Sequence, residues 1–324
     1  MMRLLLSGLS PAGPLGRLTT LIFHRVLTEP DPIFPDEIDA LRFDEICGWL
    51  ASWFNVLPLD QAIVRLREGR LPSRALAITF DDGYADNHDV ALPILRRHRL
   101  CATCFVATGF LDGGRMWNDT VIESIRTARG TTLDLRGIPG ASLDVYPLAA
   151  AQQRRQAIES VIARVKYMPM ELRLATVTDI ERRSGGNLPD DLMMKSVQVR
   201  AMSDAGMQIG AHTENHPILA SLDELAIRGE MLRSKRRLEE IVGRHVTLFA
   251  YPNGKPHRDY GAAAVRIARE LGFIGAVSTA RGVATQSTDP YQIPRFTPWD
   301  RRRLRFGMRL VQGMRTTCPE QVLA

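Results

Sequence analysis

Short apolar runs alternate with segments of helical periodicity along most of the chain. The runs have the length and composition of buried strands, and they occupy residues 75–80, 101–108, 207–212, 246–251, 273–279 and 291–296. Helical segments lie between them, and the longest, 221–243, opens with Ser221 and Glu224 in the pattern of a capping box. This strand-then-helix order predicts an α/β fold with a parallel sheet, open or closed into a barrel. In either form the functional residues belong at the C-terminal ends of the strands.

The alternation breaks over residues 112–195. Residues 113–130 and 149–168 have helical character, and the stretch between them is irregular or β-like. We expect a largely helical insertion on the active end of the sheet rather than an independent domain. The predicted organisation is an N-terminal leader or extension (1–18), a barrel (19–300) that contains the insertion (112–195), and a basic C-terminal helix or tail (301–324).

Composition and charge are those of an ordinary globular protein. Of the 324 residues, 45% are hydrophobic and 24% are charged, and the formal net charge is +6. The basic residues are scattered apart from RRRLR at 301–305, and no aromatic residues interleave with them. We therefore expect no nucleic-acid partner.

The chain carries no apolar run of about 18 residues, so we expect no transmembrane helix. Ser, Gly and Pro interrupt the apolar N-terminus before it reaches the length of a signal peptide, which favours a cytoplasmic location, with a periplasmic or membrane-peripheral one as the alternatives. Near the other end, residues 301–315 place Leu304, Met308 and Val311 at helical spacing among arginines. Such a helix packs on the barrel or contacts an anionic membrane surface.

Three groups of polar residues follow strand ends. Asp81 and Asp82 leave the run at 75–80, and adjacent carboxylates need a cation or hydrogen bonds to offset their repulsion. His212 and His216, four residues apart, suit a divalent metal. The turn at 249–256 offers backbone NH groups to a developing oxyanion. Taken singly, each group has an ordinary alternative: a helix cap, a chance pair and a surface turn.

Taken in order, TFDDG, HTENHP and FAYPNG resemble the motifs of the polysaccharide deacetylases of carbohydrate esterase family 4. The resemblance covers most of residues 19–300. It implies a distorted (β/α)7-type barrel and a divalent metal, usually zinc, with cobalt, nickel, iron or manganese as alternatives. It also implies that Asp82, His212 and His216 hold the metal and that Asp81 is the catalytic base.

Four further residues are substrate-side or loop candidates under this resemblance. Thr213 shapes the loop between the two histidines through side-chain hydrogen bonding, and the NH of Asn253 matches an oxyanion donor. Tyr251, beside that turn, is a candidate for the oxyanion or substrate side of the site, and Trp117, in the insertion, is a candidate for lining a sugar cleft. Helix packing is the alternative for Trp117.

The chain departs from the family pattern in one residue that orients the base. Many members carry an arginine where Ala250 stands. Arg295, in the run at 291–296, is our candidate replacement, and the alternative for it is an ordinary surface arginine.

A second departure concerns the general acid. No LxxH motif follows residue 260, yet a departing amine must be protonated. In the branch of poly-N-acetylglucosamine deacetylases this segment is moved to the N-terminus, as an apolar strand that ends in histidine. LIFHRV at 21–26 looks like that permuted motif, which makes His24 the candidate general acid.

The sequence thus predicts a metal-dependent hydrolase that removes N-acetyl groups from amino sugars. Its substrate would be an exopolysaccharide, a cell-surface glycan or a lipid-linked precursor. An O-acetyl esterase and a carbohydrate-binding barrel without catalysis are the alternatives. No pattern in the chain indicates an oligomeric state.

Overall fold

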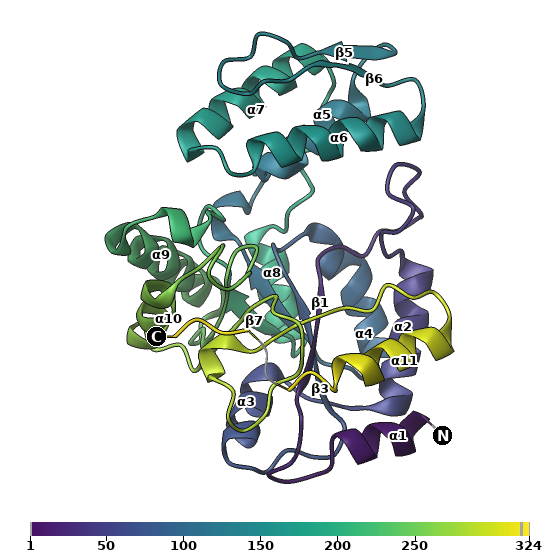
Figure 1. Ribbon diagram of the computed structural model, residues 1–324, viewed down its shortest axis with the longest axis vertical. Helices are drawn as coiled ribbons and strands as arrows, with labels where there is room; N and C mark the ends of the chain where they lie inside the picture. The colour runs from purple at the N-terminus through teal and green to yellow at the C-terminus, as the bar shows by residue number, and fades with distance from the viewer. Residues whose placement is uncertain (1, 318–319, 324) are drawn as a thin grey trace. The chain divides into compact units, whose positions relative to one another are not determined.

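The computed structural model describes residues 2–317 and 320–323, which form two compact units (Figure 1). The first unit comprises the described residues of Met1–Thr28, Ile38–Leu111 and Met194–Ala324. The second comprises Glu29–Glu37 and Asp112–Met193. No described helix is long and apolar enough to cross a membrane.

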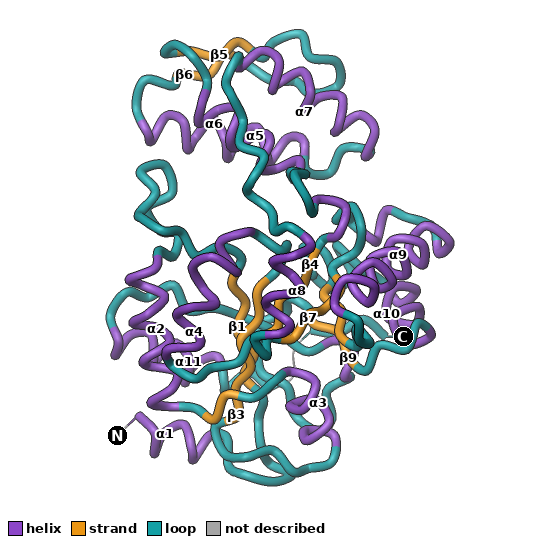
Figure 2. Tube along the Cα trace, turned by 180° about the vertical axis from the view of Figure 1, so that it is seen from behind, coloured by secondary structure: helices purple, strands orange, loops and turns teal. Residues whose placement is uncertain are grey.

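A curled parallel sheet forms the centre of the first unit, with helices around it (Figure 2). Its order is β1-β3-β4-β7-β8-β9, and β2 also pairs with β3. The strands are β1 Thr19–Phe23, β2 Asn55–Val56, β3 Ala75–Phe80, β4 Thr103–Val106, β7 Gln208–Ala211, β8 Leu248–Ala250 and β9 Gly275–Val277. All these pairs are parallel, so the predicted distorted (β/α) barrel is confirmed, in the form of a half-barrel.

Amphipathic helices cover this sheet. They are α1 Met2–Leu9, α2 Ala40–Trp53, α3 Leu59–Arg67, α4 Leu92–Arg97, α8 Ser196–Asp204, α9 Glu224–Val242, α10 Ala262–Glu270 and α11 Arg303–Gly313. Helix α2 shows the general pattern. The Asp39 carboxylate caps its first turn by accepting from the Arg42 NH, and its apolar face, which includes Phe43 and Leu50, is buried.

The register between β1 and β3 positions the chemistry. Phe23 pairs with Phe80, and their rings pack with Phe43 at centroid distances of 5.5 to 5.7 Å. All six residues of β3 are buried because the strand lies inside the sheet and is covered on both faces. The residues that follow the paired phenylalanines, His24 and Asp81, are therefore neighbours at the C-terminal edge of the sheet.

Two details of the prediction are wrong: the cap of the longest helix and the strand at 291–296. Helix α9 begins at Glu224, and its cap is the Asp223 carboxylate, which accepts from the Ala226 NH, rather than Ser221. Residues 291–296 form no strand: a short 3-10 turn at Pro290–Gln292 leads into an irregular segment. Pro290 and Pro294 explain the second error, since proline cannot donate to a strand ladder.

The ends of the chain pack on the first unit. Leu6 of α1 is fully buried, and the Arg17 guanidinium donates to the carbonyl of Met314, just after α11. Within α11, Phe306 and Leu310 are buried while Leu304 and Met308 are exposed. Residues 318–319 and 324 of the predicted C-terminal segment lie outside the described residues. Contact of this helix with a membrane stays a prediction.

The second unit has an apolar core of its own. It contains α5 Trp117–Thr127, α6 Ala151–Val165, α7 Met170–Ser184 and the antiparallel pair of β5 Thr132–Asp134 with β6 Val145–Pro147. Val121, Ile158 and Ile180 belong to its core, and so does Ile33 from the preceding loop. The sequence had not predicted α7 or the contribution of residues 29–37.

Candidate active site

The candidate site is built from residues that directly follow parallel strands. Asp81 and Asp82 follow β3, and His212 follows β7. Asp82 has a positive φ of 74° and Gly83 one of 88°, so the chain turns sharply after the second aspartate. A Cβ on Gly83 would lie 2.9 Å from the Cγ1 of Val106, which explains why glycine stands there.

Asp82, His212 and His216 bring their polar atoms together. Asp82 Oδ1 lies 3.4 Å from Nε2 of each histidine, and the candidate ligand atoms all lie within 4.8 Å of one another. His212 donates its Nδ1–H to the Ala250 carbonyl at 2.8 Å, which directs Nε2 toward the aspartates. The ring of His216 lies edge-on to that of His212.

This group fits a divalent metal. Asp82 Oδ1 is buried and has no hydrogen-bond partner among the residues that the structure describes. A buried carboxylate oxygen without a donor is costly unless a cation satisfies it. Two imidazoles and one carboxylate are a ligand set that zinc and related divalent ions use when they keep open positions for water or substrate.

Electrostatics within the group agree with a cation site. Burial raises the pKa of Asp82, but the neighbouring imidazoles of His212 and His216 outweigh it and hold the pKa below its usual range. Burial lowers the pKa of His216 to about 4, so its imidazole is neutral near pH 7 and free to act as a ligand. For His212, burial lowers the pKa, and the two aspartates more than reverse that effect.

The loop between the histidines is held from two sides. Thr213 and His216 both have positive φ, at 64° and 51°, and the Thr213 hydroxyl accepts from the His216 NH at 3.0 Å. From α9, the buried Glu230 carboxylate accepts from the backbone NH groups of Glu214 and Asn215. Our sequence analysis missed Glu230. The sequence pattern that could have identified it is an acidic residue at a position on the buried face of α9.

Asp81 is clamped by Arg295. The two guanidinium NH groups donate to the two carboxylate oxygens at 2.6 and 2.7 Å, and Arg295 is only 1% exposed. Arg295 also donates to the Thr79 hydroxyl and the Ser278 carbonyl. The alternative of a surface arginine is therefore wrong. Burial raises the pKa of Asp81, but the Arg295 guanidinium and then His212 outweigh it, so the pKa lies below its usual value.

His24 lies next to this pair. The Asp81 NH donates to the Phe23 carbonyl at 2.9 Å, and the exposed His24 imidazole is close enough to lower the pKa of both aspartates. The Asn87 amide donates to the His24 carbonyl at 2.8 Å, and Asp86 accepts from the Val26 NH at 3.2 Å. The turn after β3 thus fixes the backbone around His24. The sequence analysis had not singled out Asp86 or Asn87.

The turn after β8 presents Asn253. Its φ of 59° is followed by 73° at Gly254, and Thr279 binds both residues, through its hydroxyl to the Asn253 carbonyl and through its NH to the Gly254 carbonyl. This fixed turn is compatible with an oxyanion donor at Asn253. The donor role itself stays a prediction.

The structure describes the surroundings of the two remaining candidates, Tyr251 and Trp117, each within its own unit. Tyr251 is fully buried, stacks on Tyr260 at 3.9 Å and donates its hydroxyl to the Tyr291 carbonyl. The Tyr251 side chain therefore faces the core, and its predicted place on the oxyanion or substrate side of the site stays a prediction. Trp117 belongs to the second unit, where the Arg173 guanidinium lies over its ring at 5.0 Å.

A half-barrel with a carboxylate and two imidazoles gathered at its C-terminal edge has the ligand set of the metal-dependent hydrolases. Within that class, the chain belongs to the polysaccharide deacetylase family, whose model matches residues 68–131 and 175–275. The stretch between the two matched parts, 132–174, lies in the second unit, and residues 1–67 and 276–324 are also outside the match. The predictions of this family and of a deacetylase are confirmed.

Individual relatives are distant. YxkH of Bacillus subtilis (strain 168), whose name assigns it to the polysaccharide deacetylases, is 20% identical over 281 residues, or 86% of this chain and 70% of the relative. The solved structure of Streptococcus pyogenes deacetylase PplD in complex with acetate has a TM-score of 0.60 at 19% identity, over 92% of this chain and 98% of that one. IcaB from Ammonifex degensii gives 0.59 at 18% identity, over 94% and 98%. At such identities the two structures establish a shared fold.

Proposed function

We propose that the protein is a divalent-metal-dependent N-deacetylase. Its substrates would be amino sugars of an exopolysaccharide, a cell-surface glycan or a lipid-linked precursor. The observation that carries the proposal is the buried Asp82 Oδ1, which lacks a donor among the described residues and lies between two imidazole nitrogens. The clamped Asp81 lies beside it, with its Oδ2 at 3.9 Å from His212 Nε2.

A bound divalent metal, for which zinc is our first choice, supplies a Lewis acid that polarises the acetyl carbonyl and acidifies water. The side chains of the protein would bind this ion and accept the proton. Asp82, His212 and His216 would hold the ion. Asp81, kept ionised and oriented by Arg295, accepts the proton of the attacking water.

Two further groups complete the reaction. The Asn253 NH donates to the oxygen that gains negative charge on the acetyl carbon. His24, on the neighbouring strand end, gives its proton to the nitrogen as the bond between carbon and nitrogen breaks. Acetate and a free amino sugar leave. The cytoplasmic location expected from the sequence stays a prediction.

Acetate release from matched amide and ester substrates tests the reaction class. We expect release from N-acetylglucosamine tetramers to exceed release from O-acetylated xylan oligomers of equal length. Release from the ester alone would instead make the protein an O-acetyl esterase. A chain that holds metal and releases no acetate from any glycan would be a binding barrel.

Replacing His24 by alanine should lower amide turnover by about 10²-fold or more while metal content is retained. Ester turnover should fall much less, because an alkoxide leaves more readily than an amide anion. The measurement is kcat on the two substrates above. His245→Ala is the matched control, since that side chain is 95% exposed. Equal losses on amide and ester would remove His24 from the role of acid.

A further inference from the structure

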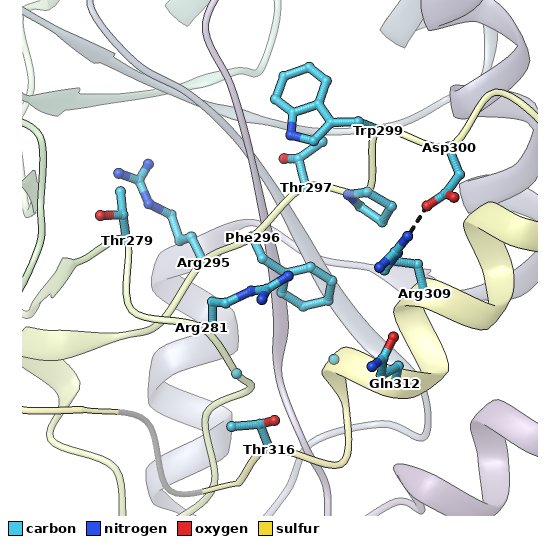
Figure 3. Close-up of a pocket in the computed structure, with 13 residues that line it drawn as sticks. Thr279, Arg281, Arg295, Phe296, Thr297, Trp299, Asp300, Arg309, Gln312 and Thr316 are labelled. Carbon is cyan, nitrogen blue, oxygen red and sulfur yellow. Dashed lines mark hydrogen bonds and ion pairs between the residues drawn. The ribbon is translucent and has the colours of Figure 1, made fainter. Parts of the chain in front are cut away.

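A cavity of about 650 Å³ opens in the first unit, and Arg295, the partner of Asp81, is one of its lining residues (Figure 3). Residues 279–282, the irregular segment 295–300 and α11 contribute its walls. The volume is in the range of small-molecule sites. Apart from Arg295, which holds Asp81, and Thr279, which holds the Asn253 turn, its residues have no role in the reaction proposed above.

Close backbone contacts build these walls. Gly313 of α11 lies so near Phe296 that a Cβ there would overlap the phenylalanine ring. Gly282 has a φ of 137°, and a Cβ on it would lie 2.7 Å from the Thr316 carbonyl oxygen. The Val283 NH also donates to that carbonyl at 3.0 Å. The cavity therefore has a fixed shape, since its opposite walls are joined by packing that only glycine permits.

Residues that line the cavity form hydrogen bonds with residues of the active site or of the strand before it. Arg295 is one of the lining residues, and its guanidinium holds Asp81. Thr279, on the same wall, binds the carbonyl of Asn253. Thr297 accepts from the Ile22 NH at 3.1 Å, two residues before His24. A ligand in the cavity would thus contact residues that hydrogen-bond to the base, to the oxyanion turn and to the strand that precedes the acid.

The exposed residues of the lining are Trp299, the arginines Arg281 and Arg309, and the uncharged polar residues Gln312 and Thr316. Trp299 is 61% exposed, which is unusual for so large an apolar side chain. Arg309 pairs with Asp300 at 3.1 Å, whereas Arg281 is exposed and forms no ion pair within residues 2–317 and 320–323. In Figure 3, Arg281 and Arg309 extend toward the Phe296 ring from opposite sides.

These groups select a ligand chemistry. The face of an indole ring packs on the apolar face of a sugar ring, and an arginine outside any ion pair favours a carboxylate or a phosphate through paired NH donors. Asp300 offsets one of the two exposed arginines, and Asp81 offsets Arg295. Of the lining arginines, Arg281 is therefore the one without an ion-pair partner in the part of the chain that the structure describes.

We propose that this cavity is a substrate subsite for an anionic sugar unit, with the sugar ring on Trp299 and its carboxylate or phosphate at Arg281. The inference rests on the proposed deacetylase function and narrows its substrate to N-acetylated glycans that carry negative charge. A uronic acid neighbour and a sugar diphosphate share this chemistry.

Binding measured without turnover tests the subsite. In the full-length Asp81→Asn chain, calorimetry should show that a hyaluronan tetrasaccharide or UDP-N-acetylglucosamine binds at least about tenfold more tightly than the neutral N-acetylglucosamine tetramer. Whichever charged probe binds more tightly identifies carboxylate or phosphate as the group recognised. Arg281→Glu should abolish the preference, and Trp299→Ala should weaken all the probes.

Arg200→Ala is the matched control, because Arg200 is an exposed arginine on α8, away from the cavity lining. It should leave every affinity unchanged. If the three probes bind equally, or if Arg281→Glu keeps the preference, the subsite proposal is overturned. Failure of acetate release with the charge preference intact would overturn the proposed reaction and leave the subsite standing.

Discussion

Replacing Asp81 by asparagine is expected to lower acetate release by about 10³-fold while the chain keeps its metal. The amide has nearly the shape of the carboxylate but cannot accept a proton from water. Asp82, His212 and His216 remain in place, so the metal ligands are intact. Turnover on N-acetylglucosamine tetramers and metal content of the same sample are the two measurements.

Asp204→Asn is the control, since the Asp204 side chain is 65% exposed on α8. It should change neither quantity. If Asp81→Asn kept normal turnover, the proton would be taken by another group. If the substitution removed the metal as well, Asp81 would be a ligand rather than a base.

The second large effect is expected at Arg295. Arg295→Ala leaves the Asp81 carboxylate, which is 3% exposed, without its cation, and removing one partner of a buried pair costs about 3–5 kcal/mol of unfolding free energy. Turnover should also fall about 10²-fold because the base loses its orientation. Denaturant unfolding at pH 7 and kcat provide the two readouts.

The pH dependence gives a sharper readout of the same change. Arg295 is the largest influence that lowers the pKa of Asp81, and burial, which raises it, remains in the variant. The base works only when ionised, so the acidic limb of the activity profile should move to higher pH in Arg295→Ala. The free energy of unfolding also depends on the ionisation of Asp81. In the native protein the pair stabilises the fold above the ordinary carboxyl pKa of about 4, and this stabilisation is lost as pH falls through the lower folded value.

Arg295→Lys separates charge from geometry. A lysine supplies a positive charge but not the two parallel NH donors that reach both Asp81 oxygens. We expect it to recover part of the stability and little of the turnover. Wild-type turnover in the lysine variant would show that the bidentate contact is unnecessary.

The strand ends could be predicted because they depend on local pattern. Residues 75–80 are six consecutive buried residues. The polar residues of DDG cannot continue such a strand, so they are expected where it ends. His24 followed by analogy with a strand that ends in histidine, and the register of β1 with β3 then places it beside Asp81. The choice of cap on α9 was missed because Ser221 and Asp223 are both good capping residues, and local sequence does not rank them.

Contacts between distant segments could not be derived from spacing alone. Arg295 and Asp81 are 214 positions apart, and Arg295 lies on an irregular segment whose path depends on Pro290 and Pro294. Tyr251 faces the core because it stacks on Tyr260, a contact that depends on the packing around α10. Glu230 serves a loop that precedes it by about 15 residues. These contacts appear only once the helices are packed on the sheet.

Metal removal and replacement test the central claim most directly. The chain is stripped with a chelator, and acetate release from N-acetylglucosamine tetramers is measured before and after one equivalent of zinc is added, in the wild type and in His212→Ala. We predict that release stops on stripping, returns with about one zinc per chain in the wild type, and does not return in the variant. Undiminished release from the stripped wild type, or full recovery in His212→Ala, would contradict it.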